Sequence, residues 1–600
     1  MVVLVAENVR AEDKMEKEKL DEIERRRKNW EETILKPAMA RLGQKEASTK
    51  FYAPLDVKDH DFLENVGFPG EYPFTAGIYP TRVGGRPSIG GAQYGEVAPT
   101  LVRAGRYAGY GTAEDTRDYY KVMVSRGQEV GPNLAFDLPT QCGYDSDDPR
   151  AVGEVGMTGV AVSTLRDFEV IYEAFTGDMD LDKIATNWTI NAPANVIIAM
   201  YVALAEKRGI PPSKLRGTPQ NDILKEYVAR GTYIFPPKHG MRMMRDSIVY
   251  CTKNMPLFNW TGCGAAHLRW AGGTGVQVAA LSLCIGAAYV QLGINAGLNV
   301  DDLVLRMTFL QPIGGGREFF KEIALARAIR RMWAEMMRER FGTKNPRSWI
   351  MRASSWATKA EQYTTKQRPL NNLIRGVIGG VMSCLSGGTP ANGLMMPYDE
   401  PLGLGHSEEG WQLNLDASRI IQYESKLTEV MDPLAGSYYV EALTDETEEE
   451  IWKVVKDIEV RGGIVAAIEQ GYIHNMLARS AYGWQRGVEN GENTIVGENE
   501  FTDKGEIEVI TGRRLESHLY DVDKMATAEE RQLDNLAKVK RERNNNEVQA
   551  CLKRLKEAAQ DDSANLMPSI LDAVKAYASI GEICGALREV FGEYQSYGII

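Results

Sequence analysis

The sequence predicts an α/β protein built on a closed barrel of eight parallel strands, a (β/α)8 barrel, with a helical arm before it and a helical extension after it. From about residue 112 to 440, short apolar or small-polar runs alternate with longer helical segments, which is the pattern of parallel strands joined by helical crossovers. The number of such units in a chain of 600 residues favours a closed barrel over an open sheet. The carboxyl ends of barrel strands form the active site, and five predicted strands end there in polar or small residues: Asp137, Asn191, Gly264, Ser354 and Thr389.

The composition is that of a globular protein, with 44% hydrophobic and 25% charged residues. The 82 acidic and 70 basic side chains give a formal net charge of −12, which argues against a nucleic-acid partner. Seven scattered cysteines without a CxxC pair exclude a disulfide scaffold and a cysteine-based zinc site, and they fit a reducing cytoplasm. We found no run of about 18 apolar residues and no signal-peptide pattern, so we expect a cytoplasmic protein without a membrane span.

The first predicted unit is an N-terminal helical arm over residues 1–50. Its charge-rich part, residues 11–45, places opposite charges three and four positions apart. Such a face is usually solvated, and the alternative is that it packs on another subunit. A turn-rich stretch follows over residues 51–111, and its interleaved Tyr, Phe and Arg residues argue against disorder.

The barrel, with its extended N-terminal segment, is predicted over residues 51–440. A helical linker region (441–520) and a helical tail (521–600) complete the chain. Strands are expected in the runs PNLAFD (132–137), NWTIN (187–191), LFNWTGCG (257–264), LVLRMTFL (303–310), SWIMRAS (348–354) and GVMSCLSGGTP (380–390). The expected helices include residues 116–127, 194–209, 275–297 and 316–342.

General motifs of catalysis are absent from the sequence. The six histidines have no metal-ligand spacing, so no metal site is predicted, and there is neither a GxxxxGK[ST] phosphate loop nor a GxSxG nucleophile motif. The GGG at 314–316 is best interpreted as the start of a helix. Paired carboxylates such as Asp145 and Asp147 leave a lyase or hydrolase as a distant alternative. Composition and spacing alone therefore indicate only an α/β barrel enzyme.

Five collinear runs are more specific: YPFTAGIYPTRVGGRP (72–87), RYAGYGTAEDT (106–116), LAFDLPTQCGYDSDDPR (134–150), GTPQNDILKEYVARGTYIFPP (217–237) and DPLAGSYYVE (432–441). They resemble the large, catalytic subunit of coenzyme B12-dependent acyl-CoA mutases, the methylmalonyl-CoA mutase family. The resemblance covers about residues 50–520, and the C-terminal residues also look like this family's tail. It implies a (β/α)8 barrel whose axis is lined by small polar side chains and holds the pantetheine arm of coenzyme A.

The resemblance also implies a cofactor and a partner. Members of this family use adenosylcobalamin for a radical 1,2-rearrangement of the carbon skeleton of an acyl-CoA. The family's cobalamin module carries a DxHxxG motif whose His binds cobalt, and this chain has no such motif. We therefore expect a separate small B12-binding subunit, and so a hetero-oligomer.

Four residues match family positions at the reacting group. His267 stands where the family has a His that donates to the thioester carbonyl, although a lone His is often structural. Gln220 matches a Gln near the acyl group and could instead cap a loop. Tyr107 matches an aromatic residue beside the substrate. Arg230 matches the Arg that pairs with the free carboxylate of methylmalonyl-CoA, whereas the isobutyryl and 2-hydroxyisobutyryl branches have Gln there.

Arg230 and Tyr107 lead us to expect a dicarboxylic acyl-CoA of the methylmalonyl-CoA/succinyl-CoA type. The alternative for Arg230 is an ion pair with an acid of the protein itself. The alternatives for the chain are a monocarboxylic isobutyryl-, pivalyl- or 2-hydroxyisobutyryl-CoA mutase subunit and a non-catalytic scaffold for a B12 subunit.

The resemblance implies further ligand-binding residues. Glu400 matches a residue that binds the adenosyl ribose. Substrate or CoA contacts are implied for seven others: Tyr79, Thr81, Arg86, Asn259, Arg306, Thr308 and Trp356. The sequence departs from the family at Ala266, at Trp356 and in an insertion over residues 88–105, so several positions around the acyl group have changed together. We infer that the acyl group can carry a larger or apolar substituent.

Overall fold

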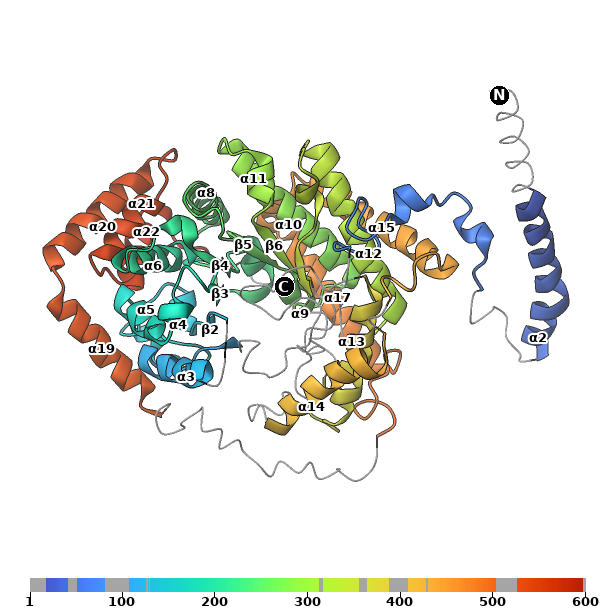
Figure 1. The fold of residues 1–600 in the computed structure, drawn as a ribbon, viewed down its shortest axis with the longest axis horizontal. Helices are drawn as coiled ribbons and strands as arrows, with labels where there is room; N and C mark the ends of the chain where they lie inside the picture. The colour runs from blue at the N-terminus through green and yellow to red at the C-terminus, as the bar shows by residue number, and fades with distance from the viewer. Residues whose placement is uncertain are drawn as a thin grey trace.

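In the part of the chain that the structure describes, seven short parallel strands form the centre and helices surround them (Figure 1). The computed structural model describes residues 18–41, 51–80, 107–125, 128, 130–311, 317–355, 364–387, 408–427, 430–502 and 526–596. Its strands are β1 (Tyr107–Ala108), β2 (Asn133–Ala135), β3 (Ala185–Thr189), β4 (Arg216–Pro219), β5 (Thr261–Gly264), β6 (Met307–Gln311) and β7 (Ala353–Ser355).

The strands pair in the order of the sequence. One parallel sheet has the order β1-β2-β3-β4 and the other has the order β5-β6-β7. Two backbone hydrogen bonds connect the neighbouring edges, from Asn259 N to Gly217 O (2.9 Å) and from Gly262 N to Gln220 O (2.8 Å). The predicted α/β class with parallel strands is therefore confirmed. No eighth strand occurs among the described residues, and Thr389 lies outside them, so closure of the barrel stays a prediction.

The structure differs from the strand predictions at one predicted run and at two strands, β1 and β4, that were not predicted. The run at 380–390 is wrong as a strand over its first part, because residues up to Leu385 belong to helix α13 (Asn371–Leu385). Gly376, Gly379 and Gly380 are buried in this helix. Because glycines take the place of larger apolar residues, the sequence here has the small-residue pattern that was used to predict a strand. Conversely, β4 has the sequence RGTP and lacks the apolar run by which strands were predicted.

The predicted helical runs that begin at 116, 194, 275 and 316 are confirmed over their described residues, which exclude 126, 127 and 316. The helices up to β7 are α3 (Ala113–Ser125), α4 (Leu138–Gln141), α5 (Leu165–Ile171), α6 (Ala194–Lys207), α7 (Ile223–Lys225), α8 (Pro237–Asn254), α9 (Ala265–Trp270), α10 (Gly275–Asn295), α11 (Val300–Val304) and α12 (Phe319–Glu335). After α13 follow α14 (Glu408–Arg419), α15 (Tyr438–Val460), α16 (Ile464–Glu469) and α17 (Tyr472–Glu489).

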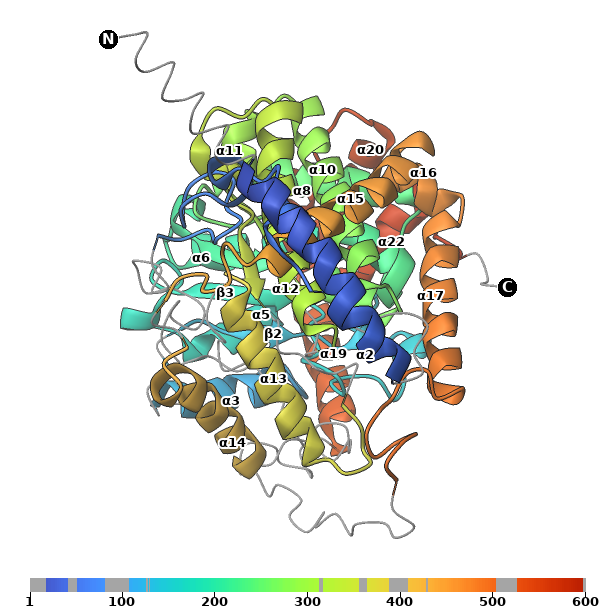
Figure 2. The same cartoon turned by 90° about the vertical axis from the view of Figure 1, so that its right-hand side faces the viewer.

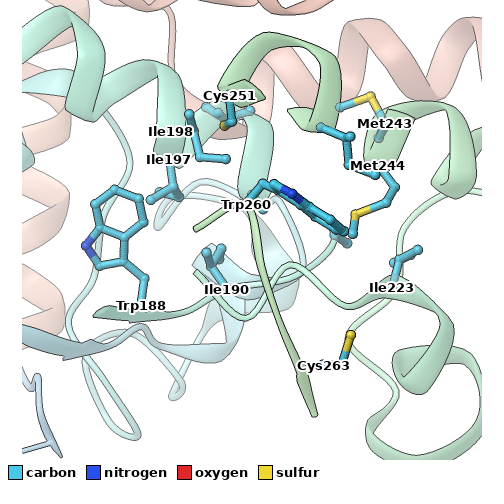
Figure 3. Packing of buried hydrophobic residues seen from close by; sticks show 14 of the residues in the cluster. Trp188, Ile190, Ile197, Ile198, Ile223, Met243, Met244, Cys251, Trp260 and Cys263 are labelled. Atoms are coloured by element: carbon cyan, nitrogen blue, oxygen red, sulfur yellow. The ribbon is translucent and has the colours of Figure 1, made fainter. Parts of the chain in front are cut away.

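The main hydrophobic core lies between the strands and these helices. Figure 3 shows Trp188 of β3 and Trp260 before β5 packed among side chains of α6 and α8. Helix α10 is long and apolar enough to cross a membrane, which the sequence analysis did not foresee. The fold buries 72% of the most apolar 18-residue stretch of α10. The apolar composition of this helix is therefore explained by its place in the core.

Helices lie near both ends of the described part of the chain. Residues 18–30 continue as helix through a π-helical turn, Glu31–Leu35, into α2 (Lys36–Arg41). This N-terminal helix stands apart from the body in Figure 1, and Figure 2 shows its whole length. The C-terminal helices are α19 (Ala528–Glu542), α20 (Asn545–Gln560), α21 (Met567–Lys575) and α22 (Ile580–Phe591), which lie beside α5 and α6.

Specific polar contacts attach the C-terminal helices to the body. Arg531 of α19 donates two hydrogen bonds to the carboxylate of Asp115 (3.0 and 2.7 Å). Arg242 of α8 donates to the carbonyls of Ala558 (3.0 Å) and Ala559 (2.5 Å) at the end of α20. A cation at that position also complements the helix dipole. The tail is thus part of the folded body.

The turn-rich segment 51–80 is held by a buried arginine of α12. Arg330 donates to the carbonyls of Phe74 (2.9 Å), Thr75 (2.5 Å) and Ser386 (2.7 Å). Burial lowers the pKa of its guanidinium to about 9, and Arg327 acts in the same direction. The contact joins the segment that carries Tyr79 to the residues after α13.

Replacing Arg330 by Met should leave three carbonyls without their donor and so destabilise the protein by about 3 kcal/mol or more. The measurement is thermal unfolding together with limited proteolysis of residues 51–80. Arg340→Met is the control, because that half-exposed side chain forms a surface ion pair with Glu459 and should change stability by less than about 1 kcal/mol. Equal unfolding temperatures for the two variants would contradict this role of Arg330.

Candidate functional site

Polar side chains that follow β3 and β4 meet in one hydrogen-bonded chain. Asn191 Nδ2 and Lys225 Nζ both donate to Gln220 Oε1, at 3.1 and 3.0 Å. Lys225 also pairs with Glu226, and Glu226 Oε2 accepts from Thr232 N (3.0 Å) and Thr232 Oγ1 (2.7 Å). The chain of contacts places these groups at the carboxyl ends of adjacent parallel strands, where ligand sites of α/β proteins occur.

Asp222 fixes the turn that leads from β4 into this cluster. Its side chain accepts from Tyr289 OH (2.7 Å) and Gly264 N (2.7 Å), and it caps α7 through Lys225 N. Its own N–H donates to Asn191 Oδ1 (3.0 Å). Burial raises the pKa of the Asp222 carboxyl, against the influence of Lys225. Asp222 thus ties the ends of β3, β4 and β5 together.

The Lys225–Glu226 ion pair is fully buried, with 0% exposure of both side chains. Burial lowers the pKa of Lys225 below its ordinary value. Burial alone would raise the pKa of Glu226, but the charges of Lys225 and Arg230 outweigh it, and the pKa lies below its ordinary value. The structure therefore keeps two opposite charges away from water, each stabilised by the other.

His267 lies one turn after β5, on helix α9. Its Nδ1 is buried, and its ring meets the ring of Trp270 edge-on at a centroid distance of 4.9 Å. A Cβ atom on Gly264 would stand 3.3 Å from His267 Nδ1 and 3.0 Å from Lys225 Cε. The imidazole and the lysine side chain thus lie around the same point at the end of β5. Glycine at 264 leaves the space that both require.

Arg230 is at the end of the π-helical turn η8 (Glu226–Arg230). Its Nη1 is buried, lies 3.6 Å from Glu226 Oε1 and has no hydrogen-bond partner among the described residues. The side chain is 22% exposed. An acid of the protein therefore does stand beside this guanidinium, as in the alternative considered for Arg230, but it leaves Nη1 able to donate.

Three arginines gather at the opposite, amino-terminal ends of the strands. Arg216 begins β4, and Arg306 and Arg352 directly precede β6 and β7. Burial lowers the pKa of Arg306, and the charges of Arg352 and Arg216 lower it further. None of the three pairs with a carboxylate in the described part of the chain. Uncompensated guanidinium groups of this kind are suited to bind phosphate.

Side chains of small polar residues lie beside these arginines. Arg352 donates to Asn259 Oδ1 (3.3 Å), and Asn259 Nδ2 donates to Thr218 Oγ1 (2.8 Å). Thr308 donates from its hydroxyl to the carbonyl of Thr261 (2.9 Å). Asn259 and Arg306, which were named from the sequence, therefore lie at the arginine end of the strands. Thr308 lies further along, opposite Gly262, whose N–H donates to the carbonyl of Gln220.

Comparison with known proteins assigns the family. A model of the methylmalonyl-CoA mutase family matches residues 42–593. The chain belongs to this family. The 2-hydroxyisobutanoyl-CoA mutase large subunit of Aquincola tertiaricarbonis is 37% identical over 588 residues, which are 96% of this chain and 97% of that protein. Methylmalonyl-CoA mutase of Escherichia coli strain K12 is 35% identical, over 89% of this chain and 70% of its own length. The human mitochondrial methylmalonyl-CoA mutase is 34% identical, over 88% and 66%.

The methylmalonyl-CoA mutase family predicted from the motifs is thus confirmed, together with its class, the acyl-CoA mutases among the isomerases. The roles of individual residues stay predictions. Tyr107 pairs through its backbone with Asn133, and Tyr79 packs partly buried against the cluster around Phe74 and Ile78. Four candidates lie outside the described residues: Thr81, Arg86, Trp356 and Glu400.

The alternative of a paired-carboxylate enzyme is contradicted by the positions of Asp145 and Asp147. Asp145 accepts from Ser579 Oγ (2.6 Å) and Gly581 N (2.7 Å) of the C-terminal tail. Lys540 pairs with both acids, at 3.1 Å and 2.8 Å. These carboxylates attach the tail to the body and are not available as an acid–base pair.

The described part of the chain offers no ligand set for a metal ion, since no three His, Cys, Asp or Glu side chains group together there. His474 Nε2 hydrogen-bonds the carbonyl of Tyr227 (2.7 Å), His239 stacks on Phe591 at 4.3 Å, and His60 lies 3.3 Å from Asp445. Three of the described histidines thus have structural surroundings.

Sequence reasoning missed Lys225, Glu226, Arg216 and Arg352 as site residues. A signal for the arginines exists: the strand starts read LRGTP, LRMTF and MRASS, with an Arg and then a hydroxyl residue two positions later. Residues two apart on a strand point to the same face. The Lys-Glu pair stood inside a quoted motif, but its burial could not be read from adjacent opposite charges, which are usually exposed.

Replacing Glu226 by Gln should destabilise the protein by about 3–5 kcal/mol near pH 7, because the buried Lys225 loses its counter-charge. The loss should shrink as the pH rises towards 10, since deprotonated Lys225 carries no uncompensated charge. Thermal unfolding across this pH range measures both effects.

The double variant Lys225→Met/Glu226→Gln is the matched control, because it removes both charges. It should be more stable than Glu226→Gln at pH 7. A pH-independent loss in the single variant would contradict a charged Lys225–Glu226 pair.

Proposed function

We propose that this chain is the large subunit of a two-component, adenosylcobalamin-dependent mutase that rearranges the carbon skeleton of an acyl-CoA. The observation that carries the proposal is the collinear match with the 2-hydroxyisobutanoyl-CoA mutase large subunit over 96% of this chain and 97% of that protein. The sequence lacks DxHxxG, which supports a separate small subunit that holds the cobalamin. Adenosylcobalamin, when bound, supplies the radical chemistry, and this chain binds the thioester and excludes water.

The amino-terminal ends of the strands are suited to the phosphates of coenzyme A. Arg216, Arg306 and Arg352 bring three guanidinium groups together, and their mutual repulsion lowers the pKa of Arg306 beyond the effect of burial. A bound dianionic phosphate would relieve this repulsion. The strands then direct the remainder of the ligand towards their carboxyl ends.

The carboxyl ends of the strands are suited to the thioester. Gln220 and His267 stand after β4 and β5, on strands joined by the hydrogen bond from Gly262 N to Gln220 O. Both side chains carry N–H donors, which stabilise negative charge that develops on a thioester oxygen. In this role they orient the acyl group and hold the carbonyl during the rearrangement.

For the acyl group we propose a short branched monocarboxylic acid of the 2-hydroxyisobutyryl type first. The length-matched relative supports it, and so does the ion-pair distance of 3.6 Å between Arg230 and Glu226. A guanidinium with an internal acid does not require a substrate carboxylate. The dicarboxylic acyl-CoA expected from the sequence is the second candidate, and the buried Arg230 Nη1 without a hydrogen bond among the described residues supports it.

The test is reconstitution of this chain with a small B12-binding subunit and adenosylcobalamin, followed by mass spectrometry of products from a panel of acyl-CoA thioesters. We expect turnover of 2-hydroxyisobutyryl-, isobutyryl- or pivalyl-CoA that Arg230→Gln changes by less than about threefold. Turnover confined to methylmalonyl- or a substituted succinyl-CoA and reduced about 100-fold by Arg230→Gln would favour the second candidate. No turnover of any thioester would contradict the proposed function.

Replacing His267 by Ala should lower kcat by about 10²–10³-fold, the usual effect of removing one donor that acts on the transition state. His267→Gln retains an N–H group and should recover part of the rate. Steady-state kinetics on the reconstituted enzyme measure both. Equal rates for His267→Ala and the unaltered enzyme would exclude this role of His267.

A further inference from the structure

The orientation of the Gln220 carboxamide is set by its neighbours. An ammonium group can only donate hydrogen bonds, so the atom of Gln220 that lies 3.0 Å from Lys225 Nζ is the oxygen. Asn191 Nδ2 donates to the same oxygen at 3.1 Å. Two donors use both lone pairs of Oε1, and this side of the carboxamide is saturated.

The amide nitrogen of Gln220 is consequently turned away from Lys225 and Asn191. Gln220 is only half-buried, and within the described ranges Nε2 donates to no protein atom. Gln220 therefore presents an N–H donor, and not an acceptor, to whatever occupies the space beyond it. A thioester carbonyl can accept such a hydrogen bond, whereas a methylene group cannot.

The Lys225 side chain is held beside Gln220 by its burial, its ion pair and its packing. Its side chain is fully buried, and Glu226 neutralises it. Its Cε would lie 3.0 Å from a Cβ on Gly264, so the alkyl chain is packed against the end of β5. The groups that face the ammonium are Gln220, Glu226, Asp222 and Arg230.

We propose that Lys225 is a positioning residue that makes Gln220 a hydrogen-bond donor to the acyl carbonyl of the substrate. The inference rests on the proposed function, because it takes an acyl-CoA as the ligand. Lys225 itself does not touch the ligand in this arrangement. It acts through the Gln220 carboxamide: Glu226 holds the Lys225 ammonium in place, and the ammonium orients the carboxamide.

The test is a binding measurement that does not depend on turnover. The full chain with its small subunit, without adenosylcobalamin, is titrated calorimetrically with 2-hydroxyisobutyryl-CoA and with its thioether analogue, in which a methylene replaces the carbonyl. Isobutyryl- and methylmalonyl-CoA with their thioethers are the further pairs. The unaltered protein should prefer a thioester about tenfold or more. Lys225→Met/Glu226→Gln, which removes both buried charges together, should lower this preference about three- to tenfold.

Three further variants separate positioning from general damage. Gln220→Met should cause the same loss, and adding it to the double variant should lower the preference no further, as expected when one residue acts through another. Lys207→Met, on the exposed face of α6, should leave the preference unchanged. Gln220→Glu keeps the partner of Lys225 but presents only acceptors, so it should lose the preference even though the network is intact.

The following outcomes would overturn the positioning role or the proposed function. An unchanged thioester preference in a folded Lys225→Met/Glu226→Gln protein, or full additivity with Gln220→Met, overturns the positioning role. If that double variant does not fold, a thioester preference retained by Gln220→Glu overturns it. Unaltered protein that binds none of the thioesters overturns the proposed function, and with it the ligand assumed here.

Discussion

The buried ion pair of Lys225 and Glu226 is the interaction on which the candidate site depends. Two charges without water are tolerated only when every remaining donor and acceptor is used. Glu226 meets this demand through Lys225 and through the N–H and hydroxyl of Thr232, with the charge of Arg230 nearby. Its contacts thereby define the path of the chain from the end of β4 to the loop after η8. Loss of Glu226 alone would leave Lys225 and Arg230 without their counter-charge and Thr232 without its acceptor.

The loop around the pair is also supported from outside. His474 of α17 hydrogen-bonds the carbonyl of Tyr227 (2.7 Å). Tyr594, after α22, donates its N–H to Ile234 O (3.0 Å), and its ring contacts the ring of Tyr227 at a centroid distance of 4.9 Å. Residues more than 200 positions away in the sequence thus restrain the segment that carries Glu226 and Arg230. The C-terminal helices therefore contribute to the geometry of the site as well as to stability.

Much of the architecture could be predicted because it depends on local pattern. Long apolar helices such as α6 and α10 and strands with apolar runs such as β6 follow from the local hydrophobic pattern. The failures have a common cause. Where residues are small because neighbouring groups pack closely, as at Gly217 of β4, or where buried glycines replace apolar side chains, as in α13, the usual strand and helix signals disappear.

The candidate site was predictable only in part, for a related reason. Gln220, Arg230 and His267 were identified through resemblance, since nothing in their spacing marks them. Lys225 looked like a surface residue, because a buried lysine is rare and burial is a property of the fold. Whether Arg230 meets an acid of the protein was likewise undecidable, because the distance to Glu226 depends on a π-helical turn. The roles of Lys225 and Arg230 therefore depend on the groups that the fold places around them, and not on residue type alone.

The strands carry different chemistry at their two ends, and β4 does so within one element. Arg216 begins it and Gln220 follows it, about 13 Å away at the rise of an extended chain. An acyl-CoA bound along β4, as proposed above, would have its phosphates near Arg216 and its acyl group near Gln220, so the distance between these two residues would determine which bond of the ligand lies beside the donor groups. Substitutions near Gln220 would then change which acyl group is accepted and would leave the arginines at the nucleotide end unchanged.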